Sequence, residues 1–254
     1  KKKLKKIITI APKINFPQRF DIPNEKVSSE AHKKAILLLK KPSYINKLKA
    51  SKLLLNSAEN KFNDNPALGR LIFVYSELLE NSSTKTDDAN TIFKLVQIFK
   101  TKALIDPLYC SGIALFYLNI EKSNSAVKVI EKYRDVKKGP LTLEVLSVYL
   151  RALASVGDLV KSKDVSEKIM TIPSEKRPLF VDVSLIDYFL FLGNYEKASE
   201  VLAGAIKKYP DSVALLLKSA KLFVYQEDFK SLGLVLKKIR VLEADRSKVY
   251  YSKY

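Results

Sequence analysis

The chain has 254 residues, and its 47% hydrophobic content is typical of a folded protein, which excludes wholesale disorder. With Cys110 as its one cysteine and His32 as its one histidine, it can form neither a disulfide framework nor a zinc site of Cys and His ligands. The formal net charge of +18 favours a polyanionic partner, and a surplus that serves only solubility is the alternative.

Residues 1–27 are predicted to form an extended basic arm. Pro12, Pro17 and Pro23 disfavour helix, and residues 1–50 hold 14 Lys and Arg against three acidic residues, which is +11 of the total +18. Lysines along an extended segment suit contacts with RNA phosphates, although a solvated tail or a leftover targeting segment has the same composition. The RNA-contacting residues predicted in the arm are Lys1, Lys2, Lys3, Lys5, Lys6, Lys13 and Arg19.

Residues 28–65 are predicted to form a helical hairpin. The stretch SSEAHKKAILLLKK starts with a capping-type serine followed by an acid, and its apolar run ends before Pro42. A second helix follows in SYINKLKASKLLLNSAENKF, where apolar residues recur at helical spacing. The first helix extends the basic surface of the arm, and we expect its lysines to contact RNA as well. These lysines are Lys33, Lys34, Lys40 and Lys41.

Residues 66–243 are predicted to form pairs of helices joined by short connectors. The second helices carry small or mid-helix markers at Ala89, Ala126, Ser162, Ala198 and Leu232. Successive markers are 37, 36, 36 and 34 residues apart, and hairpins with such a period stack to bury a continuous core. We therefore predict an all-α fold, a right-handed α-solenoid of about five helix hairpins. Its helices are expected at 66–80, 86–100, 107–119, 123–136, 141–157, 158–170, 179–193, 194–209, 212–228 and 229–243.

Residues 179–212 resemble a tetratricopeptide repeat. The residues that carry the resemblance are Leu185, Phe189, Gly193, Tyr195, Ala198, Leu202, Ala205 and Pro210. Glycine permits the tight turn between the two helices, alanines permit close packing, and proline ends the second helix. Asp182 departs from the family, which has Trp or Tyr at this position.

Two units of 36 residues, 107–142 and 143–178, are similar to pentatricopeptide repeats, the RNA-binding relatives of that family. The stretch VYLRALASVGDLVKSKDVSEKIM carries this similarity, with an aliphatic first helix, a Gly-Asp turn and a second helix that ends in Met. Together, the two resemblances cover about residues 66–243 and imply a stack of helical repeats.

The ligand-reading positions of these two families are only partly kept. Peptide-binding tetratricopeptide grooves present Lys, Arg and Asn on the first helices, and this clamp is essentially absent. The matching residues are Phe180, Val183, Asp187, Ala214, Leu217 and Lys221. Pentatricopeptide proteins read bases with a small polar residue, a role that Ser111 and Ser147 could serve. The next two units have Val183 and Leu217 instead, so the sequence does not specify a base code.

Residues 244–254 are predicted to form a basic and aromatic tail. Arg246 and Lys248 lie among tyrosines, as the cations of the arm lie among aromatic residues, and we also predict that they contact RNA. The tyrosines of the tail could equally cap the last hydrophobic face of the helical stack.

Motifs that support catalysis are not found in the sequence. It has no Walker-type glycine loop, GxSxG, HExxH or glycine-rich dinucleotide turn, so we expect no enzymatic activity, no cofactor and no small-molecule substrate. Cys110 lies in the apolar run LYCSGIALFYL and is predicted to be a buried structural thiol. The best candidate for a membrane span, VSLIDYFLFLG, is interrupted by Asp187 and is shorter than the roughly 20 residues required, so we expect no span.

The expected partners are RNA, with ribosomal RNA bound through its phosphates as the foremost candidate, and neighbouring proteins of a larger complex. Because pentatricopeptide-like proteins are organellar, the resemblance implies a mitochondrial ribosomal protein, or a factor bound to that ribosome or to mitochondrial transcripts, in the matrix. The alternative is a cytoplasmic tetratricopeptide adaptor that binds proteins without RNA. Recognition of specific mRNA sequences through Ser111 and Ser147 is a third hypothesis.

Overall fold

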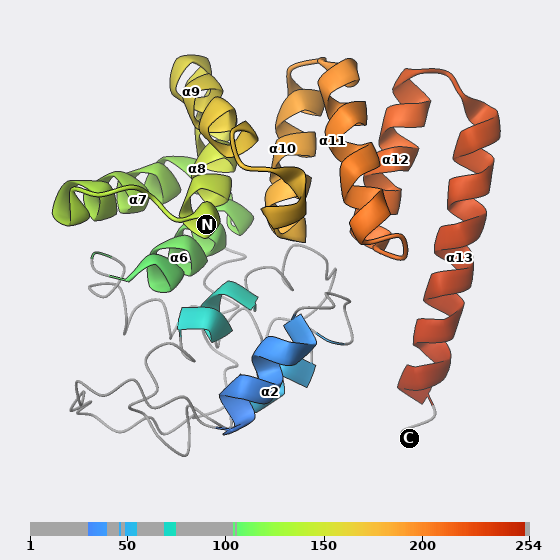
Figure 1. Cartoon of the computed structure of the whole chain (residues 1–254), viewed down its shortest axis with the longest axis horizontal. Coiled ribbons are helices and arrows are strands. Elements are labelled where there is room, and N and C mark those ends of the chain that lie inside the picture. Colours follow the sequence, from blue (N-terminus) through green and yellow to red (C-terminus); the bar gives the residue numbers. More distant parts are fainter. Residues whose placement is uncertain are drawn as a thin grey trace, which may run out of the picture. The chain divides into compact units, whose positions relative to one another are not determined.

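The computed structural model describes residues 30–39, 46, 49–54, 69–74, 104 and 106–251. Every regular element in these ranges is a helix, which confirms the all-α prediction (Figure 1). The chain divides into two compact units, Lys1–Val145 and Leu146–Tyr254. The predicted arm 1–27 and the predicted helix 86–100 lie outside the described residues.

In the first unit, the described helices agree with the sequence-based prediction. Helix α2 (Glu30–Leu39) lies inside the predicted first helix, and α6 (Pro107–Asn119) and α7 (Ser123–Lys137) form a hairpin. Side chains of α6 pack against α2 and against the helical residues 49–54 and 69–74. This core contains Ala35, Ala50, Leu54, Leu71, Ile72, Val74, Tyr109, Ile113 and Phe116.

Gly112 shows how closely α6 approaches the 69–74 segment. A Cβ atom at Gly112 would lie 2.9 Å from Ile72 Cγ2 and 2.9 Å from the Phe73 backbone nitrogen. Two helices can approach this closely only where one of them lacks a side chain, so glycine is required by packing at this position. Cys110 beside it is fully buried, and burial raises the pKa of its thiol to about 12. The predicted burial of this thiol is confirmed.

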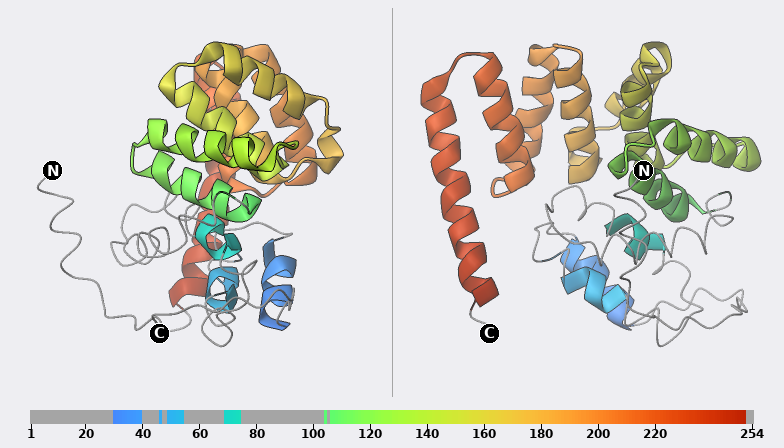
Figure 2. Two further views of the ribbon diagram at one scale, coloured as in Figure 1. Left: turned by 90° about the vertical axis from the view of Figure 1, so that its left-hand side faces the viewer. Right: turned by 180° about the vertical axis from the view of Figure 1, so that it is seen from behind.

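The second unit continues the pairing of helices. Its helices are α8 (Leu143–Val156), which starts just before the boundary, α9 (Leu159–Met170), a 3₁₀ turn η2 (Ser174–Lys176), α10 (Leu179–Phe191), α11 (Tyr195–Lys208), α12 (Val213–Tyr225) and α13 (Phe229–Tyr251). Helix α10 packs against α11 and α12, and α12 packs in turn against α11 and α13. In the views from the front and from behind, helices α10 to α13 form a row in chain order, with α13 at its end (Figures 1 and 2).

Helix α13 is longer than the sequence analysis predicted. We expected it to end at residue 243 and a tail to follow, but the helix runs on to Tyr251. Residues 244–251, ADRSKVYY, contain neither proline nor glycine, so nothing in them stops a helix that has already formed. Arg246 and Lys248 therefore lie on a helical backbone rather than in an extended tail.

The four turns that connect the paired helices between residues 106 and 251 share one backbone geometry. After α10, the N–H of Asn194 donates to the Phe189 carbonyl at 2.9 Å and the N–H of Gly193 donates to the Leu190 carbonyl at 3.1 Å. This is a Schellman termination, which needs one residue with a positive φ. The residues in that conformation are Glu121 (φ 60), Gly157 (φ 79), Gly193 (φ 68) and Glu227 (φ 56). Their spacings of 36, 36 and 34 residues match the period predicted for this part of the chain.

A buried ion-pair network holds the connector between α9 and α10. The Asp182 carboxylate, which is 0% exposed, accepts a hydrogen bond from Arg177 Nε at 2.9 Å and another from Lys208 Nζ. Lys208 Nζ also donates to the carbonyls of Ser174 and Arg177, at 2.6 and 2.9 Å. Burial raises the pKa of Asp182, and the two cations oppose that increase. The departure from the tetratricopeptide pattern at this position is thus part of a structural clamp.

Candidate functional site

Two of the predicted RNA-contacting residues have described side chains. Lys33 and Lys34 are both exposed on α2, and Lys49 and Lys52 are exposed on the next helical segment of the same unit. Four lysines on the described N-terminal helices are therefore accessible to a polyanion. The other predicted residues cannot be placed by side chain: Lys1, Lys2, Lys3, Lys5, Lys6, Lys13, Arg19, Lys40 and Lys41 lie outside the described residues, and Arg246 and Lys248 are described by backbone only.

The two serines considered as base readers are buried. Ser111 is 0% exposed and its hydroxyl donates to the Pro107 carbonyl at 2.8 Å, and Ser147 is 1% exposed. A serine inside a helix commonly satisfies its hydroxyl on the preceding turn of its own backbone. The expectation that these serines could read RNA bases is therefore wrong, because neither side chain reaches the surface. Sequence spacing placed them on the first helices but could not say which side of the helix they occupy.

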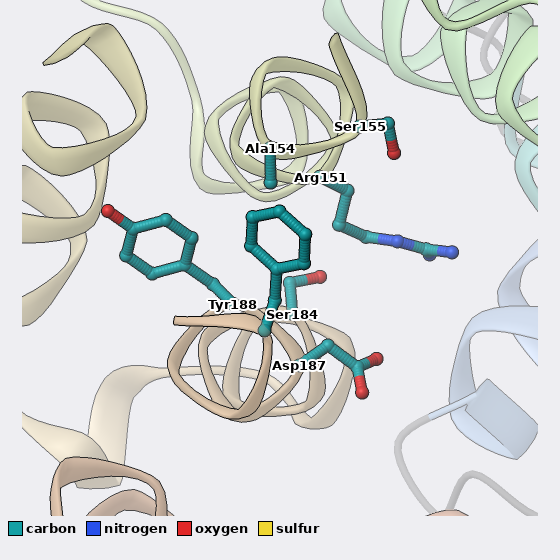
Figure 3. Close-up of a pocket in the computed structure, with 7 residues that line it drawn as sticks. Arg151, Ala154, Ser155, Ser184, Asp187 and Tyr188 are labelled. Atoms are coloured by element: carbon teal, nitrogen blue, oxygen red, sulfur yellow. The ribbon is translucent and has the colours of Figure 1, made fainter. Parts of the chain in front are cut away.

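A pocket of about 190 Å³ lies between α8 and α10. Arg151 reaches from α8 and Asp187 from α10 toward the same side of the pocket, while Tyr188 lies on the other side (Figure 3). The volume is below the roughly 300–1,000 Å³ of sites that enclose a small molecule. The lining residues are Arg151, Ala154, Ser155, Ser184, Asp187, Tyr188 and Phe191.

The polar groups that α10 contributes to this pocket are engaged with the protein itself. Asp187 Oδ1 lies 2.6 Å from Lys218 Nζ of α12, and the Ser184 hydroxyl donates to the Phe180 carbonyl at 2.8 Å. On the other side, the Tyr188 hydroxyl lies 3.5 Å from the Ser162 hydroxyl of α9. These contacts tie α9 and α12 together through α10. The arrangement suits a recess in a contact surface better than a site that holds a reacting group.

Helices α10 and α12 each expose apolar side chains, and α12 carries cations beside them. Phe191 is 61% exposed, Leu217 is 51% exposed and Val224 is 52% exposed. Lys221 is exposed on the same stretch of α12, and Lys218 is half-buried in its ion pair with Asp187. An exposed apolar surface rimmed by charge is typical of protein contact sites. The sequence analysis identifies Leu217 only as a position that lacks ligand-reading chemistry and does not predict this surface.

No protein-family model matches the chain, and no curated protein shows significant similarity to it. The resemblance of residues 179–212 to a tetratricopeptide repeat therefore stays a hypothesis from sequence, whereas the paired helices and their common turn are properties of this structure.

In the part of the chain that the structure describes, no helix combines the length and the apolar character that crossing a membrane requires. Likewise, no three His, Cys, Asp or Glu side chains of the described residues are grouped so that they could hold a metal ion. The surfaces that remain as candidates are the exposed lysines of the first unit and the apolar faces of the second.

Proposed function

We propose that this protein is a non-catalytic, RNA-associated structural component of a ribonucleoprotein, built as a right-handed α-solenoid with a basic N-terminal arm. The arm and the lysines of the first helices contact RNA phosphates, and the helical faces contact neighbouring proteins. The observation that carries the proposal is the placement of charge, since residues 1–50 hold +11 of the total +18. Such a concentration of cations attracts a polyanion whatever its sequence.

The side chains of the described region support phosphate contacts over base reading. Lys33, Lys34, Lys49 and Lys52 are exposed, and lysine makes point-charge contacts that carry no sequence information. Ser111 is buried with its hydroxyl satisfied, which removes a candidate for base recognition. RNA shape and phosphate spacing are then what the protein recognises, as expected for a component that docks on folded ribosomal RNA.

The proposed setting follows from the pentatricopeptide resemblance of units 107–142 and 143–178. Proteins of that kind work in organellar gene expression, so we propose a mitochondrial ribosomal protein or a factor of mitochondrial translation in the matrix. Co-sedimentation of the native protein with mitochondrial ribosomes, in a form that RNase abolishes, is the direct test. Sedimentation with cytosolic fractions alone would contradict the setting.

A salt titration tests the RNA-binding mechanism. The affinity of the whole chain for a structured RNA and for a single strand is measured between low and physiological salt. On single strands the log–log slope should be roughly −0.7 per neutralised phosphate, and deletion of residues 1–27 should flatten it. Changing Lys33, Lys34, Lys49 and Lys52 to Gln should flatten it further.

The matched control removes charge elsewhere. Lys163→Gln with Lys168→Gln changes two exposed lysines of α9 and should leave the slope close to that of the unmodified chain. If RNA affinity is unaffected by deletion of residues 1–27, the arm is not the contact and the mechanism is wrong.

A protein adaptor without RNA binding is the second candidate, and the exposed apolar side chains Phe191, Leu217 and Val224 favour it. This function predicts that the chain binds no RNA at physiological salt and that Leu217→Lys abolishes binding of a protein partner. It shares the solenoid with the first proposal but needs no arm, so the salt titration separates the two.

A further inference from the structure

We propose that the outer stripe of α13, formed by Phe229, Gly233, Leu236 and Arg240, is a docking site for an acidic amphipathic helix of a partner protein. The incoming helix would lie along α13 as α12 lies along α11 within this chain. The proposal concerns a surface that the RNA-binding mechanism does not use, so it stands or fails independently of RNA binding.

The two second helices α11 and α13 can be aligned without ambiguity. Each follows a Schellman turn, and the side chains of Asn194 and Asp228 cap the backbones of Lys197 and Ser231 at 3.1 and 3.0 Å. This alignment shifts the numbering by 34 residues. The outer stripe of α13 then corresponds to Tyr195, Ser199, Leu202 and Ile206 of α11.

In α11 the corresponding stripe is covered. Leu202 is 5% exposed, and the Tyr195 ring stacks on the Tyr225 ring of α12 with their centroids 4.9 Å apart. In α13 the equivalent residues are open, because Leu236 is 50% exposed and Phe229 is 69% exposed. The two helices thus place large apolar side chains at the same positions, which α12 helps to cover on α11 and which are exposed on α13.

Glycine on the stripe favours a helix as the occupant. A Cβ atom built at Gly233 would have nothing within 4 Å, so neither packing within the chain nor the backbone requires glycine there. A glycine inside a helix costs roughly 1 kcal/mol relative to alanine, and it allows a neighbouring backbone to come close. Phe229 and Leu236 lie one turn before and one turn after Gly233 on the same face of the helix, so the missing side chain leaves a shallow depression between two apolar residues.

The charges around the stripe select the partner. At three aligned positions α13 has a cation where α11 has none. Lys230, Lys237 and Arg240 of α13 correspond to Glu196, Ala203 and Ile206 of α11. All three cations are exposed. An acidic helix would be attracted to this surface, whereas a second copy of the chain would bring the same cations against one another. Charge complementarity therefore favours an acidic partner over self-association.

The outer stripe can be altered without disturbing the core of the hairpin. Val235, Ile239 and Leu242 lie on a different face of α13, roughly 120° around the helix from the stripe, and pack against Val213 and Leu216 of α12. Changes at Phe229, Leu236 or Arg240 are therefore expected to leave α13 folded, which circular dichroism and thermal unfolding verify before binding is measured.

The test uses a helical probe taken from the chain itself. A synthetic peptide with the α12 sequence, in which Lys218 and Lys221 are changed to Glu, is the acidic probe, and the unchanged α12 peptide is the basic control. Binding to the full chain is measured by fluorescence anisotropy. The acidic probe should bind saturably, and at least about tenfold more tightly than the basic control.

Variants of the full chain then locate the site. Leu236→Glu should weaken the acidic probe by about tenfold or more, and Arg240→Glu should shift preference toward the basic peptide. Val160→Glu on α9 is the matched control, since Val160 is 76% exposed and lies outside the stripe; it should leave the affinity unchanged. Tighter binding of the basic peptide to the Arg240→Glu variant than to the unmodified chain would support the proposed charge pairing.

Three results would overturn the proposal. Absence of saturable binding by the acidic probe, or equal binding by Leu236→Glu and the unmodified chain, excludes this docking mode. Concentration-dependent dimerisation that Leu236→Glu abolishes would make the occupant a second copy. Loss of RNA affinity in Arg240→Glu as large as that caused by deleting residues 1–27 would make the stripe an RNA surface.

Discussion

The hairpins α10–α11 and α12–α13 have the same turn and the same kind of cap, yet different interactions hold their helices together. In the first, Asp182 pairs with Lys208 in a buried ion-pair network. At the equivalent positions of the second, Leu216 packs with Leu242 in an apolar cluster. One backbone geometry therefore accepts either a salt bridge or a hydrophobic contact, provided that each buried group has a partner.

The largest effect is expected from breaking the ionic clamp. Asp182→Ala leaves Arg177, which is 6% exposed, and Lys208 without their shared carboxylate, and should lower the free energy of unfolding by about 3–5 kcal/mol. Chemical denaturation followed by circular dichroism measures this loss. The double variant Asp182→Leu with Lys208→Leu places the leucine pair of the second hairpin in the first and should recover part of the lost stability. If no stability is recovered, the two hairpins are not interchangeable at this position.

The apolar contact of the second hairpin should cost somewhat less to break. Leu216 is 5% exposed, and Leu216→Ala removes buried methyl groups and leaves a cavity, so we expect a loss of about 2–4 kcal/mol. Leu217→Ala, one residue along, changes a side chain that is 51% exposed and serves as the control with little effect. Equal losses in the two variants would contradict the assigned packing of α12.

The turns of the two hairpins should both favour glycine, so that removing it from one turn and adding it to the other have opposite effects on stability. Gly193→Ala introduces a side chain at a φ of 68° and should destabilise the protein by about 1 kcal/mol. Glu227→Gly relieves the same strain at a φ of 56° and should stabilise it by about 0.5 kcal/mol, since the flexible unfolded chain offsets part of the gain. Glu200→Gly inside α11 is the matched control and should destabilise, and thermal unfolding checks all three signs.

The smallest expected effect is a difference in pH dependence between the two caps. Hydrogen bonds from Ser231, donated by its side chain and its backbone N–H, lower the pKa of Asp228 from its ordinary value of 3.8. The stability that Asp228 contributes is therefore present above pH 3.8 and is lost as the pH falls through the lower folded-state pKa. Asn194 does not titrate. Asp228→Ala should thus cost less at about pH 2–3 than at about pH 7, whereas Asn194→Ala should cost about the same at both, as denaturation at the two pH values would reveal.

Much of the fold between residues 106 and 251 could be predicted from local sequence signals. Gly157 and Gly193 mark turns that need a positive φ, and the 36-residue spacing extends the same turn to Glu121, where no glycine signals it. The predicted end of α13 at residue 243 is wrong, because the polar stretch EADRSK interrupts the apolar pattern without ending the helix. Pattern predicts where a helix is buried better than where it stops.

The candidate surfaces were much less predictable. Ser111 and Ser147 sit at positions where a pentatricopeptide repeat would expose them, but here they face the interior. The pocket beside Arg151 joins residues of α8 and α10 that no sequence spacing brings together. Such features depend on the rotation of each helix about its own axis, which a few side-chain volumes in the core decide.

By itself, the sequence determined the helical period, the positions of the turns and the concentration of positive charge near the N-terminus, because each depends on residues close together in the chain. Only the tertiary structure decided that Asp182 meets Lys208 from the next helix and that the outer stripe of α13 is open while its counterpart on α11 is covered. Burial and long-range pairing are properties of packed surfaces, and neighbours in space decide them.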